Sequence, residues 1–494
     1  MKYIEGTPRN QLCLFEEKLN DLIEEEHLIR FIDLYVDKLD LIELEIHAND
    51  KSKGIGYDPC LYLKIYIYSY LNRIRSSRKI ERECKRNIEL IWLTKQLSPD
   101  HWSISNFRKM NKKSLKNIFK DFLRFCHKLN LLSFDCVAID GTKMRAQNSM
   151  SNIYKKDEID KSLEKIEQKI DEYITELESN DKMEQDEYDF LNRNISEKLK
   201  HLKKHKDKLE FIKEIFKKNT DIKRYFANDP DSNFQKDNGR CVVGYNCQSG
   251  VDEKNKLIIA TEVTNESNDL HQLNNMKEKV DEIKKDLKIE KKSICVTDAG
   301  YHSEIEILEA IKDKNFDLYI PHPRDVKTKE SHGKEKKDKP PLKGYEQDNF
   351  MYDKEKNIFI CPKGKVLEQR GKGSIRKGIK KIRYQCKICN NCEVLDLCTV
   401  NKIDGRSIEI SENFEKIKEF REKVKSELGK KVVLKRKELV EHPFGTIKRN
   451  FGYTYFMQRG IEKVKAEFSF IAFIYNFKRA IKIIGVKNML EALN

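Results

Sequence analysis

The spacing of apolar residues predicts that residues 1–132 form a helical domain. Apolar residues recur at intervals of three or four from about residue 14 onward, and residues 62–71 are typical of a buried helix. Residues 97–109 add a turn, a cap and a basic helix, which is the outline of a helix-turn-helix. The same pattern fits a helical hairpin that packs on the rest of the protein, and the sequence does not decide between the two.

In this candidate recognition helix, Ile104 and Phe107 are expected to face inward. Asn106, Arg108 and Lys109 are expected to face outward, where they would contact DNA.

Residues 154–218 form a charged insert in which apolar residues step by three and four in two runs. A polar break at residues 179–181 separates the runs, which predicts two helices in an antiparallel coiled-coil hairpin. An inert spacer, a dimerisation arm and an arm that reaches DNA all fit this pattern. The apolar positions are Ile159, Leu163, Ile166, Ile170, Ile174 and Leu177 in the first run, and Leu191, Ile195, Leu199, Leu202, Leu209 and Ile212 in the second.

Two short apolar runs each end in an aspartate near a glycine. AIDGTK carries Asp140 and VTDAGYHS carries Asp298. Each run predicts a buried strand that delivers a carboxylate at its C-terminal end. One such carboxylate is more often a turn or a helix cap than a metal ligand, but two in matching contexts favour a shared site. Tyr301 and His302 follow the second aspartate and are candidates for positioning a bound DNA strand, although a helix-cap neighbour explains His302 equally well.

The remaining elements complete a mixed α/β core. The order of strands before a helix-borne glutamate matches an RNase H-like layout, with helices on both sides of a mixed sheet. Strands are predicted at residues 241–246, 257–263 and 318–321, and helices at 273–287, 303–312 and 411–428. The catalytic core is assigned to residues 133–153 and 219–324, its C-terminal part to 411–494, and a flexible linker (327–347) with a cysteine-rich insert to 325–410.

A third carboxylate, Glu441, lies in the basic segment VEHPFGTIKR, seven residues before Lys448. That spacing is two helical turns, so both side chains are expected on one face. A carboxylate inside a cationic patch is well placed to hold a metal ion while its neighbours hold phosphates. An ordinary amphipathic helix gives the same pattern, and only the presence of Asp140 and Asp298 favours a site.

Five cysteines lie close together in the sequence: Cys361 in CPKG, and Cys386, Cys389, Cys392 and Cys398 in CKICNNCEVLDLC. A CxxC pair offers two thiolates from one tight turn, and Zn²⁺ prefers four soft ligands in a tetrahedron. The spacing therefore predicts a small zinc-ribbon-like unit with a structural metal, the alternative being free thiols in an unstructured insert.

Composition agrees with a nucleic-acid partner. Lys and Arg total 98 against 82 acids, a net charge of +16, although lysine is abundant throughout the chain. The sequence has no run of 18 apolar residues, and residues 1–6 lack a signal-peptide core, so we expect a cytoplasmic protein with no membrane partner. Thirteen cysteines, mostly scattered, suit a reducing compartment. A small-molecule enzyme is least favoured, because no glycine-rich phosphate loop or nucleophile elbow occurs.

Together these motifs resemble the bacterial insertion-sequence transposases of the DDE class, above all the insertion-sequence group numbered eleven eighty-two. Asp140, Asp298 and Glu441 match the three acids of that class. The stretches NDPDSNFQKDNGRCVVGYNCQSGVD and TEVTNESNDLHQL are similar to the strand-and-turn segments that such enzymes carry between their first two acids. The resemblance extends from about residue 7 to about residue 484.

The chain departs from the Tyr-Arg-Glu-Lys signature of related transposases. Arg436 lies one residue too far from Glu441, and Leu434 stands where the tyrosine is expected. The family's cysteine positions match Cys361, Cys389, Cys392 and Cys398, which implies that these four bind zinc and leaves Cys386 as a spare or alternate ligand.

The resemblance implies a DNA transposase in which Asp140, Asp298 and Glu441 hold two Mg²⁺ or Mn²⁺ ions for DNA cleavage and strand transfer. It implies a homodimer on double-stranded DNA, both element ends and target, in the bacterial cytoplasm at the nucleoid. Lys143, Arg436, Lys448 and Arg449 are expected to contact this DNA. Two other classes remain open: a metal-dependent nuclease without strand transfer, and a non-catalytic zinc-containing DNA-binding protein derived from a transposase.

Overall fold

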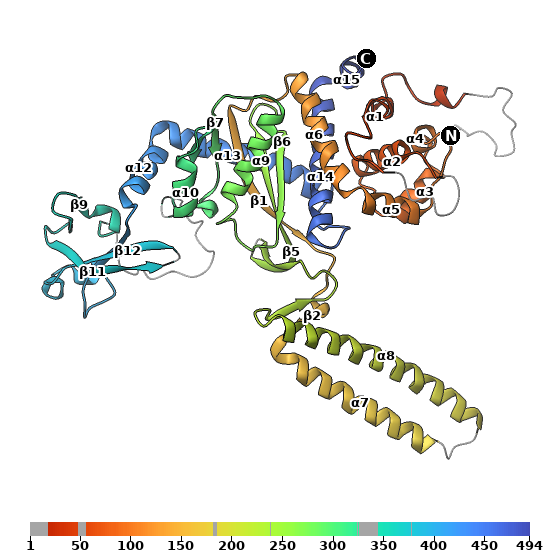
Figure 1. Cartoon of the computed structure of the whole chain (residues 1–494), viewed down its shortest axis with the longest axis horizontal. Helices are drawn as coiled ribbons and strands as arrows, with labels where there is room; N and C mark the ends of the chain where they lie inside the picture. The colour runs from red at the N-terminus through yellow and green to blue at the C-terminus, as the bar shows by residue number, and fades with distance from the viewer. Residues whose placement is uncertain are drawn as a thin grey trace, which may run out of the picture. The chain divides into compact units, whose positions relative to one another are not determined.

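The computed structural model describes residues 18–47, 56–180, 185–237, 239–323, 325, 344–376 and 378–494. The chain divides into two compact units (Figure 1). The first comprises Met1–Asp269, Asn275–Glu290 and Glu438–Asn494, and the second comprises Leu270–Asn274 and Lys291–Lys437. The predicted linker at 327–347 lies largely outside the described residues. Within the described ranges, no helix has the length and apolar character of a membrane span.

Helices form the first part of the first unit, as predicted. They are α1 (Leu28–Asp37), α2 (Pro59–Leu71), α3 (Ser77–Cys84), α4 (Ile88–Leu93), α5 (His101–Met110) and α6 (Lys112–Lys128), preceded by a 3₁₀ turn at Leu19–Leu22. Asp58 and Asp100 cap α2 and α5, each accepting hydrogen bonds from backbone N–H groups of the first helical turn. Nearly every side chain of α2 is buried, which explains its continuous apolar run.

An aromatic core joins these helices to the C-terminal helix α14 (Ile461–Ile484), which α15 (Val486–Glu491) follows. The rings of Phe31 and Phe477 lie 5.1 Å apart, and those of Phe122 and Phe473 lie 5.3 Å apart. Such offset and edge-on pairs contribute about 0.5–1.5 kcal/mol each beyond the burial of their area. The N-terminal helices therefore belong to the hydrophobic core of the first unit.

The sheet of the first unit is antiparallel and is built on β5 (Arg240–Asp252). β5 pairs with β1 (Cys136–Arg145), with β4 (Asn233–Asp237) and with β6 (Ile258–Thr264). α9 (Leu273–Asp286) follows β6 in the sequence. In α14, buried Asn476 accepts a hydrogen bond from the Ile258 N–H (2.8 Å) and donates one to the Ile258 carbonyl (2.7 Å), so this helix satisfies the backbone of β6.

The charged insert forms the two helices that the sequence predicts, α7 (Ile159–Asn180) and α8 (Gln185–Lys218). Figure 1 shows them antiparallel and side by side. Eight of the twelve predicted apolar positions lie in one buried cluster, and Leu177 and Leu202 pack partly buried against it. Ile174 is exposed, which its prediction did not expect, and the side chain of Leu191 lies outside the described residues. Ion pairs such as Lys206–Glu167 (2.7 Å) and Lys213–Asp160 (2.7 Å) join the two helices. The short strands β2 (Ile153–Lys155) and β3 (Arg224–Phe226) pair at the base of the hairpin.

The second unit combines a parallel strand pair with a separate antiparallel sheet. β7 (Ser293–Val296) and β8 (Phe316–Tyr319) are parallel and are connected through α10 (Glu304–Ile311). The antiparallel sheet has the order β13-β12-β11-β10-β9. Its strands are β9 (Met351–Asp353), β10 (Ile358–Ile360), β11 (Val366–Arg376), β12 (Ile379–Gln385) and β13 (Ser407–Ser411), with α11 (Leu395–Cys398) and α12 (Phe414–Lys425) beside them in sequence. The protein is thus a mixed α/β structure.

The buried carboxylate of Asp229 ties α14 to the sheet of the first unit. Its Oδ1 accepts hydrogen bonds from the Tyr245 hydroxyl (2.7 Å) and from the Gly460 N–H (3.0 Å), just before α14. Asp231 Oδ2 accepts from the Ile461 N–H (2.8 Å), so two acids lie at the positive end of the helix dipole. Burial nevertheless dominates and raises the pKa of Asp229 above its usual value of 3.8.

We therefore expect Asp229→Asn to change how thermal stability depends on pH. A raised pKa means that the protonated side chain stabilises the folded state fully below the unfolded pKa of 3.8, and that this stabilisation is lost as the pH rises through the folded pKa. The melting temperature of the wild type should fall more steeply above pH 4 than that of the variant. Asp221→Asn, at an exposed position, should keep the wild-type slope, and equal slopes for all three proteins would contradict this role of Asp229.

Candidate active site and cysteine cluster

Asp140 lies in the middle of β1, which continues five residues beyond it to Arg145. The prediction that the strand ends at this aspartate is wrong, because β5 pairs with β1 along nine positions from Val137 to Arg145. Asp140 is half-buried opposite Ser249. Its Oδ1 accepts a hydrogen bond from the Gly141 N–H (2.8 Å), which orients the carboxylate.

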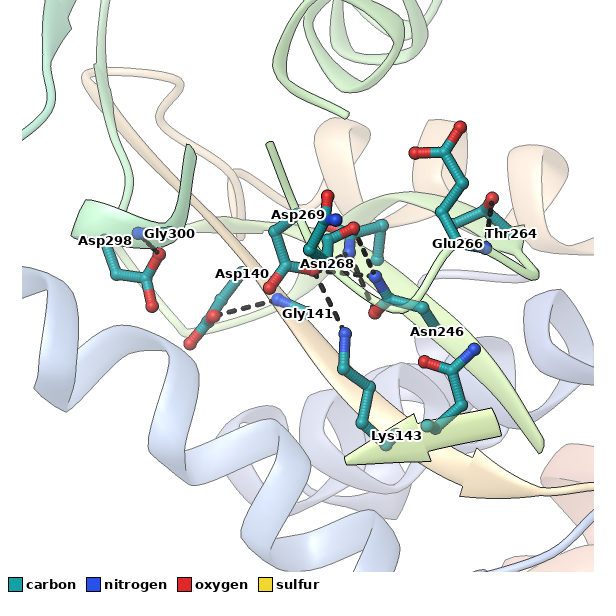
Figure 2. Close-up of polar contacts among 12 residues, drawn as sticks. Asp140, Gly141, Lys143, Asn246, Thr264, Glu266, Asn268, Asp269, Asp298 and Gly300 are labelled. Atoms are coloured by element: carbon teal, nitrogen blue, oxygen red, sulfur yellow. Dashed lines mark hydrogen bonds and ion pairs between the residues drawn. The ribbon is translucent and has the colours of Figure 1, made fainter. Parts of the chain in front are cut away.

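A network of polar side chains surrounds Asp269 beside this strand (Figure 2). One carboxylate oxygen of Asp269 accepts hydrogen bonds from Asn246 Nδ2 (2.7 Å) and Gln248 Nε2 (2.7 Å) and lies 3.4 Å from Lys143 Nζ. Asn246 and Gln248 are fully buried, and Lys143 is largely buried. The charge of Lys143, predicted to contact DNA, is therefore engaged by Asp269. The sequence does not indicate Asp269 as a partner, because it lies 126 residues after Lys143 and is brought close by the pairing of β5 with both β1 and β6.

Glycine after Asp140 leaves room for this network. A Cβ atom on Gly141 would lie 2.5 Å from Gln248 Nε2 and 2.7 Å from Asp269 Oδ1. Gly141 and Lys143 face Gln248 and Asn246 in the register of β1 and β5. Because side chains alternate along a strand, Asp140 points to the opposite face of β1. The Asp-Gly pair thus places a carboxylate on one face and leaves room for a buried polar network on the other.

Asp298 lies in the second unit, two residues after the end of β7. Its Oδ1 accepts a hydrogen bond from the Gly300 N–H (2.8 Å) and caps the 3₁₀ turn Ala299–Tyr301, as Figure 2 shows. The predicted strand-then-carboxylate arrangement is therefore present here. Tyr301 is fully buried, so the expectation that it contacts DNA is wrong. His302 packs edge-on against His322, with ring centroids 4.6 Å apart, and burial lowers its pKa.

Glu441 is exposed on α13 (Glu427–Gly445), the helix that runs from the second unit into the first. The next residue, His442, anchors this part of α13 to α14: its Nδ1 is hydrogen-bonded to the Tyr475 hydroxyl (2.8 Å) and its Nε2 to Arg479 (3.2 Å). Pro443 lies inside the helix, and a π-helical turn at Thr446–Asn450 follows it. Turns of this kind occur often at functional sites, and here the turn carries Lys448.

The predicted DNA-contacting residues differ in accessibility. Arg449 and Lys109 are exposed, whereas Lys448 is half-buried with its Nζ 3.8 Å from Asp237. Arg436 is half-buried in the second unit, and Asn106 is half-buried with its Nδ2 3.2 Å from the Met110 sulfur.

Arg108 contradicts its prediction outright. It is buried, donates a hydrogen bond to the Tyr70 hydroxyl (3.1 Å), and lies 5.8 Å from the ring centroid of Tyr66. Ile104 and Phe107 are buried, as predicted. Arg108 therefore points from α5 into an aromatic core. Its cation–π contact with Tyr66 and its hydrogen bond to Tyr70, both in α2, compensate for the lost hydration of the guanidinium.

The carboxylates have the donor chemistry that Mg²⁺ and Mn²⁺ prefer. A backbone N–H holds one oxygen of Asp140 and one of Asp298, which is the outer-shell support usual for ligating carboxylates. Among the residues that the structure describes, no group of three or more His, Cys, Asp or Glu side chains is arranged to hold a metal ion.

Four of the five clustered cysteines gather around one small cavity. Cys361, Cys389, Cys392 and Cys398 all line this space of about 20 Å³, which is the size of a single ion or water. Cys386 is buried in the same apolar cluster and is hydrogen-bonded to Cys389, but it does not line the cavity. Burial raises the pKa of Cys389 and Cys398, and the neighbouring thiols raise it further.

Two tight turns direct backbone N–H groups at these sulfurs. The Lys365 N–H donates to Cys361 Sγ (3.2 Å), and Gly364 has a φ of +76° that this turn requires. The Arg406 N–H donates to Cys389, and a Cβ on the preceding Gly405 would lie 2.3 Å from the Cys389 Cβ. N–H donors of this kind stabilise thiolate ligands, so the four cysteines and their turns have the chemistry that zinc requires. In the part of the chain that the structure describes, their sulfurs are not arranged as a metal-binding group.

Comparison with known families gives two matches. Residues 360–481 match the family described as "Transposase DDE domain", and residues 17–110 match "Transposase domain (DUF772)". The first match contains Glu441 and the five clustered cysteines, and the second contains helices α1 to α5. No curated protein and no solved structure matches the chain.

Gly141→Ala tests the close packing beside Asp140. We expect it to lower the free energy of unfolding by about 1–3 kcal/mol, because the added methyl group must displace Gln248 or Asp269. Gly445→Ala is a matched control: nothing lies within 4 Å of its Cβ position and its backbone is helical, so its stability should stay the same or rise by up to about 1 kcal/mol. Denaturant unfolding measures both, and equal stability for the two variants would contradict the packing described.

Proposed function

This chain belongs to the DDE transposases of insertion sequences, and on that premise we propose that Asp140, Asp298 and Glu441 form one catalytic centre that cleaves element ends and transfers them to target DNA. The proposal includes an RNase H-like core around β1 and β7, and a homodimer as the acting species on DNA. In this proposal Asp140 and Asp298 have the same role as metal ligands, and Glu441 on helix α13 is the third ligand.

The shared design of the two aspartates carries this proposal. Asp140 lies within the largely buried strand β1, and Asp298 follows the largely buried strand β7. Each aspartate is half-buried, and each has one carboxylate oxygen that accepts a hydrogen bond from a glycine N–H at 2.8 Å. A carboxylate that only capped a turn would explain Asp298 but not Asp140, which lies within a strand and has no turn to cap. A common role as divalent-cation ligands explains both.

In the proposed mechanism, the three carboxylates bind two Mg²⁺ or Mn²⁺ ions beside a phosphodiester of the DNA. When bound, these ions supply Lewis-acid stabilisation of the attacking and leaving oxygens. The glycine N–H groups keep Asp140 and Asp298 in one orientation, and the His442 contacts to Tyr475 and Arg479 hold the segment of α13 that bears Glu441. These contacts would orient each carboxylate before an ion or DNA binds.

Nearby cations would hold the DNA in this site. Arg449 is exposed and Lys448 is only weakly paired, at 3.8 Å from Asp237, so both are available for phosphate oxygens. Lys143 has a different part in this proposal: its ion pair with Asp269 supports the strand that bears Asp140.

Zinc is the structural metal that we propose for Cys361, Cys389, Cys392 and Cys398. Four thiolate ligands leave no open coordination position, so the ion would stabilise the small sheet rather than take part in catalysis. The buried thiols, whose pKa values are raised, would ionise only with a cation among them. Cys386, outside the cavity, is not needed as a ligand.

Asp140→Asn, Asp298→Asn and Glu441→Gln should each abolish metal-dependent cleavage of an element-end duplex. Each change removes one ligand charge and should lower the cleavage rate by on the order of 10³-fold, which corresponds to several kcal/mol of lost stabilisation. DNA affinity should change by less than about threefold, because phosphate contacts from cations supply it. The control variant Asp221→Asn changes an exposed aspartate that is far in sequence from all three acids, and it should cleave at the wild-type rate.

A strand-transfer assay with a pre-cleaved end separates transposition from simple nuclease activity. Joining of that end to a target duplex by the wild type supports the proposal. Cleavage without joining would identify a nuclease, and DNA binding without any metal-dependent cleavage would identify a non-catalytic DNA-binding protein.

Metal analysis of the purified protein tests the zinc proposal separately. The wild type should contain about one zinc ion per chain, and Cys361→Ser and Cys392→Ser should each lose most of it together with thermal stability. Cys386→Ser and the exposed Cys241→Ser should retain it. Unchanged zinc in Cys361→Ser, or an equal loss in Cys241→Ser, would refute the assignment.

A further inference from the structure

The β11–β12 ribbon, defined here as Val366–Arg376 and Ile379–Gln385, concentrates positive charge. Its 18 residues include six Lys or Arg residues and one acid, a net charge of +5, whereas the whole chain of 494 residues carries +16. The cations are Arg370, Lys372, Arg376, Lys380, Lys381 and Arg383, and the acid is Glu368. Figure 1 shows these two strands lying next to each other in the sheet of the second unit.

The ribbon is unusually exposed for part of a sheet. Every residue of β11 except Leu367 is exposed to solvent. Leu367 and Tyr384 join the apolar cluster that also contains the cysteines, which anchors the base of the ribbon. The rest of β11 is exposed, whereas much of β12 is half-buried and pairs with β13. Arg370 donates a hydrogen bond to Gln385, and Arg383 donates one to the Ser407 hydroxyl (3.1 Å). Both acceptors are neutral, so these contacts leave the positive charges uncompensated.

The register of the ribbon places like charges together. Arg370 is the direct cross-strand partner of Arg383, and like charges at such positions are destabilising. Two carboxylates lie near them in the sheet. Glu409 is the β13 partner of Arg383 and also lies 3.5 Å from Arg376 in an exposed pair. Glu368, two residues before Arg370 in β11, pairs with Lys387 (2.6 Å). A fold that needed these side chains only for solubility would gain nothing from opposing two arginines. A polyanion bound across both strands would remove the repulsion.

A bulge between Arg370 and Ser374 shapes the ribbon. It contains Gly371 and Gly373, with φ angles of +75° and +85°, and it carries Lys372. Bulges bend a strand and increase its twist. Lys372 and Lys380 are exposed, and neither has an ion-pair partner among the residues that the structure describes.

We propose that the exposed cations of the β11–β12 ribbon bind the phosphates of double-stranded DNA, with the ribbon lying along a groove. This inference rests on the proposed function, which makes DNA the substrate. A two-stranded ribbon fits the major groove, whose width is about 12 Å. Phosphate contacts fix position without reading sequence, so the ribbon would hold DNA of any sequence.

Charge and exposure favour DNA over an anionic membrane. Membrane-surface elements place basic residues beside a continuous apolar face that enters the lipid. The ribbon offers Ile375 and Val366 as its exposed large apolar side chains, and these lie at opposite ends of β11. Lys381 is excluded from the proposed surface, because it is half-buried in an ion pair with Glu304 (3.1 Å).

Salt dependence of DNA binding provides the test. The full-length ribbon variant Arg370→Gln/Lys372→Gln/Arg376→Gln is compared with Lys200→Gln/Lys203→Gln/Lys204→Gln, which removes the same charge from exposed positions of α8. A labelled 30-base-pair duplex is titrated at several salt concentrations. The ribbon variant should bind at least about tenfold more weakly near 0.1 M salt, and its slope of log affinity against log salt should fall by about 2–3, since each phosphate contact contributes about 0.9.

The α8 control should bind within about twofold of the wild type. A charge-preserving variant, Arg370→Lys/Arg376→Lys, should keep the wild-type slope, which separates loss of charge from loss of folding. If the triple ribbon variant does not fold, Lys372→Gln alone, at the exposed bulge, should still reduce the slope by about 0.9.

The outcomes separate this inference from the proposed function. A wild type that does not bind DNA overturns both. A wild type that binds and cleaves DNA while the ribbon variants keep its slope overturns the ribbon surface alone. An equal loss of DNA affinity in the α8 control would show that net charge governs binding, and it would also overturn the ribbon surface. Binding of both proteins to anionic vesicles is measured alongside. If the ribbon variant loses vesicle binding but binds DNA like the wild type, the ribbon is a membrane surface and the proposal is overturned.

Discussion

The pairing of β1 with β5 is the constraint on which the proposed site depends. Nine consecutive partners fix the register from Val137–Asp252 to Arg145–Gly244. A Cβ on Gly244 would lie 2.1 Å from the Met144 carbonyl oxygen, so the two strands approach too closely at that end for any side chain. This register puts Asp140 on one face of β1 and the buried network around Asp269 on the other. A slip of one residue would exchange the two faces.

The charged side chains of this protein have two kinds of environment. Buried and half-buried charges of the first unit are matched one by one, as Lys143 is by Asp269 and as Asp229 is by two hydrogen-bond donors. In the β11–β12 ribbon, by contrast, cations face one another across the strands and outnumber acids. Buried charges must be paired to offset lost hydration, whereas exposed cations remain soluble unpaired and are free to bind a polyanion. The contrast separates the charges that hold the fold from the cations that we propose to contact DNA.

Local patterns predicted the elements better than they predicted the directions of side chains. The helices of residues 28–128, the two helices of the insert and the strands from β5 to β8 follow from apolar periodicity and from turn residues. The CPKG turn at Cys361 is also local, because its glycine and its N–H donor lie within four residues. Arg108 could not be predicted, since its environment is made by aromatic rings of another helix. The extension of β1 past Asp140 needed β5, about one hundred residues later in the chain.

Localised oxidative cleavage of the protein tests the central claim, that three acids distant in sequence share divalent ions. Fe²⁺ is substituted for Mg²⁺ in the full-length protein, and hydrogen peroxide and ascorbate are added. The bound Fe²⁺ reduces the peroxide to hydroxyl radicals, which cut the backbone close to the ion, and ascorbate regenerates Fe²⁺. The account predicts cuts clustered near residues 140, 298 and 441, suppressed together by excess Mg²⁺ and lost together in Asp140→Asn. Cuts near one acid alone, or cuts at the three positions that respond independently to Asp140→Asn, would contradict it.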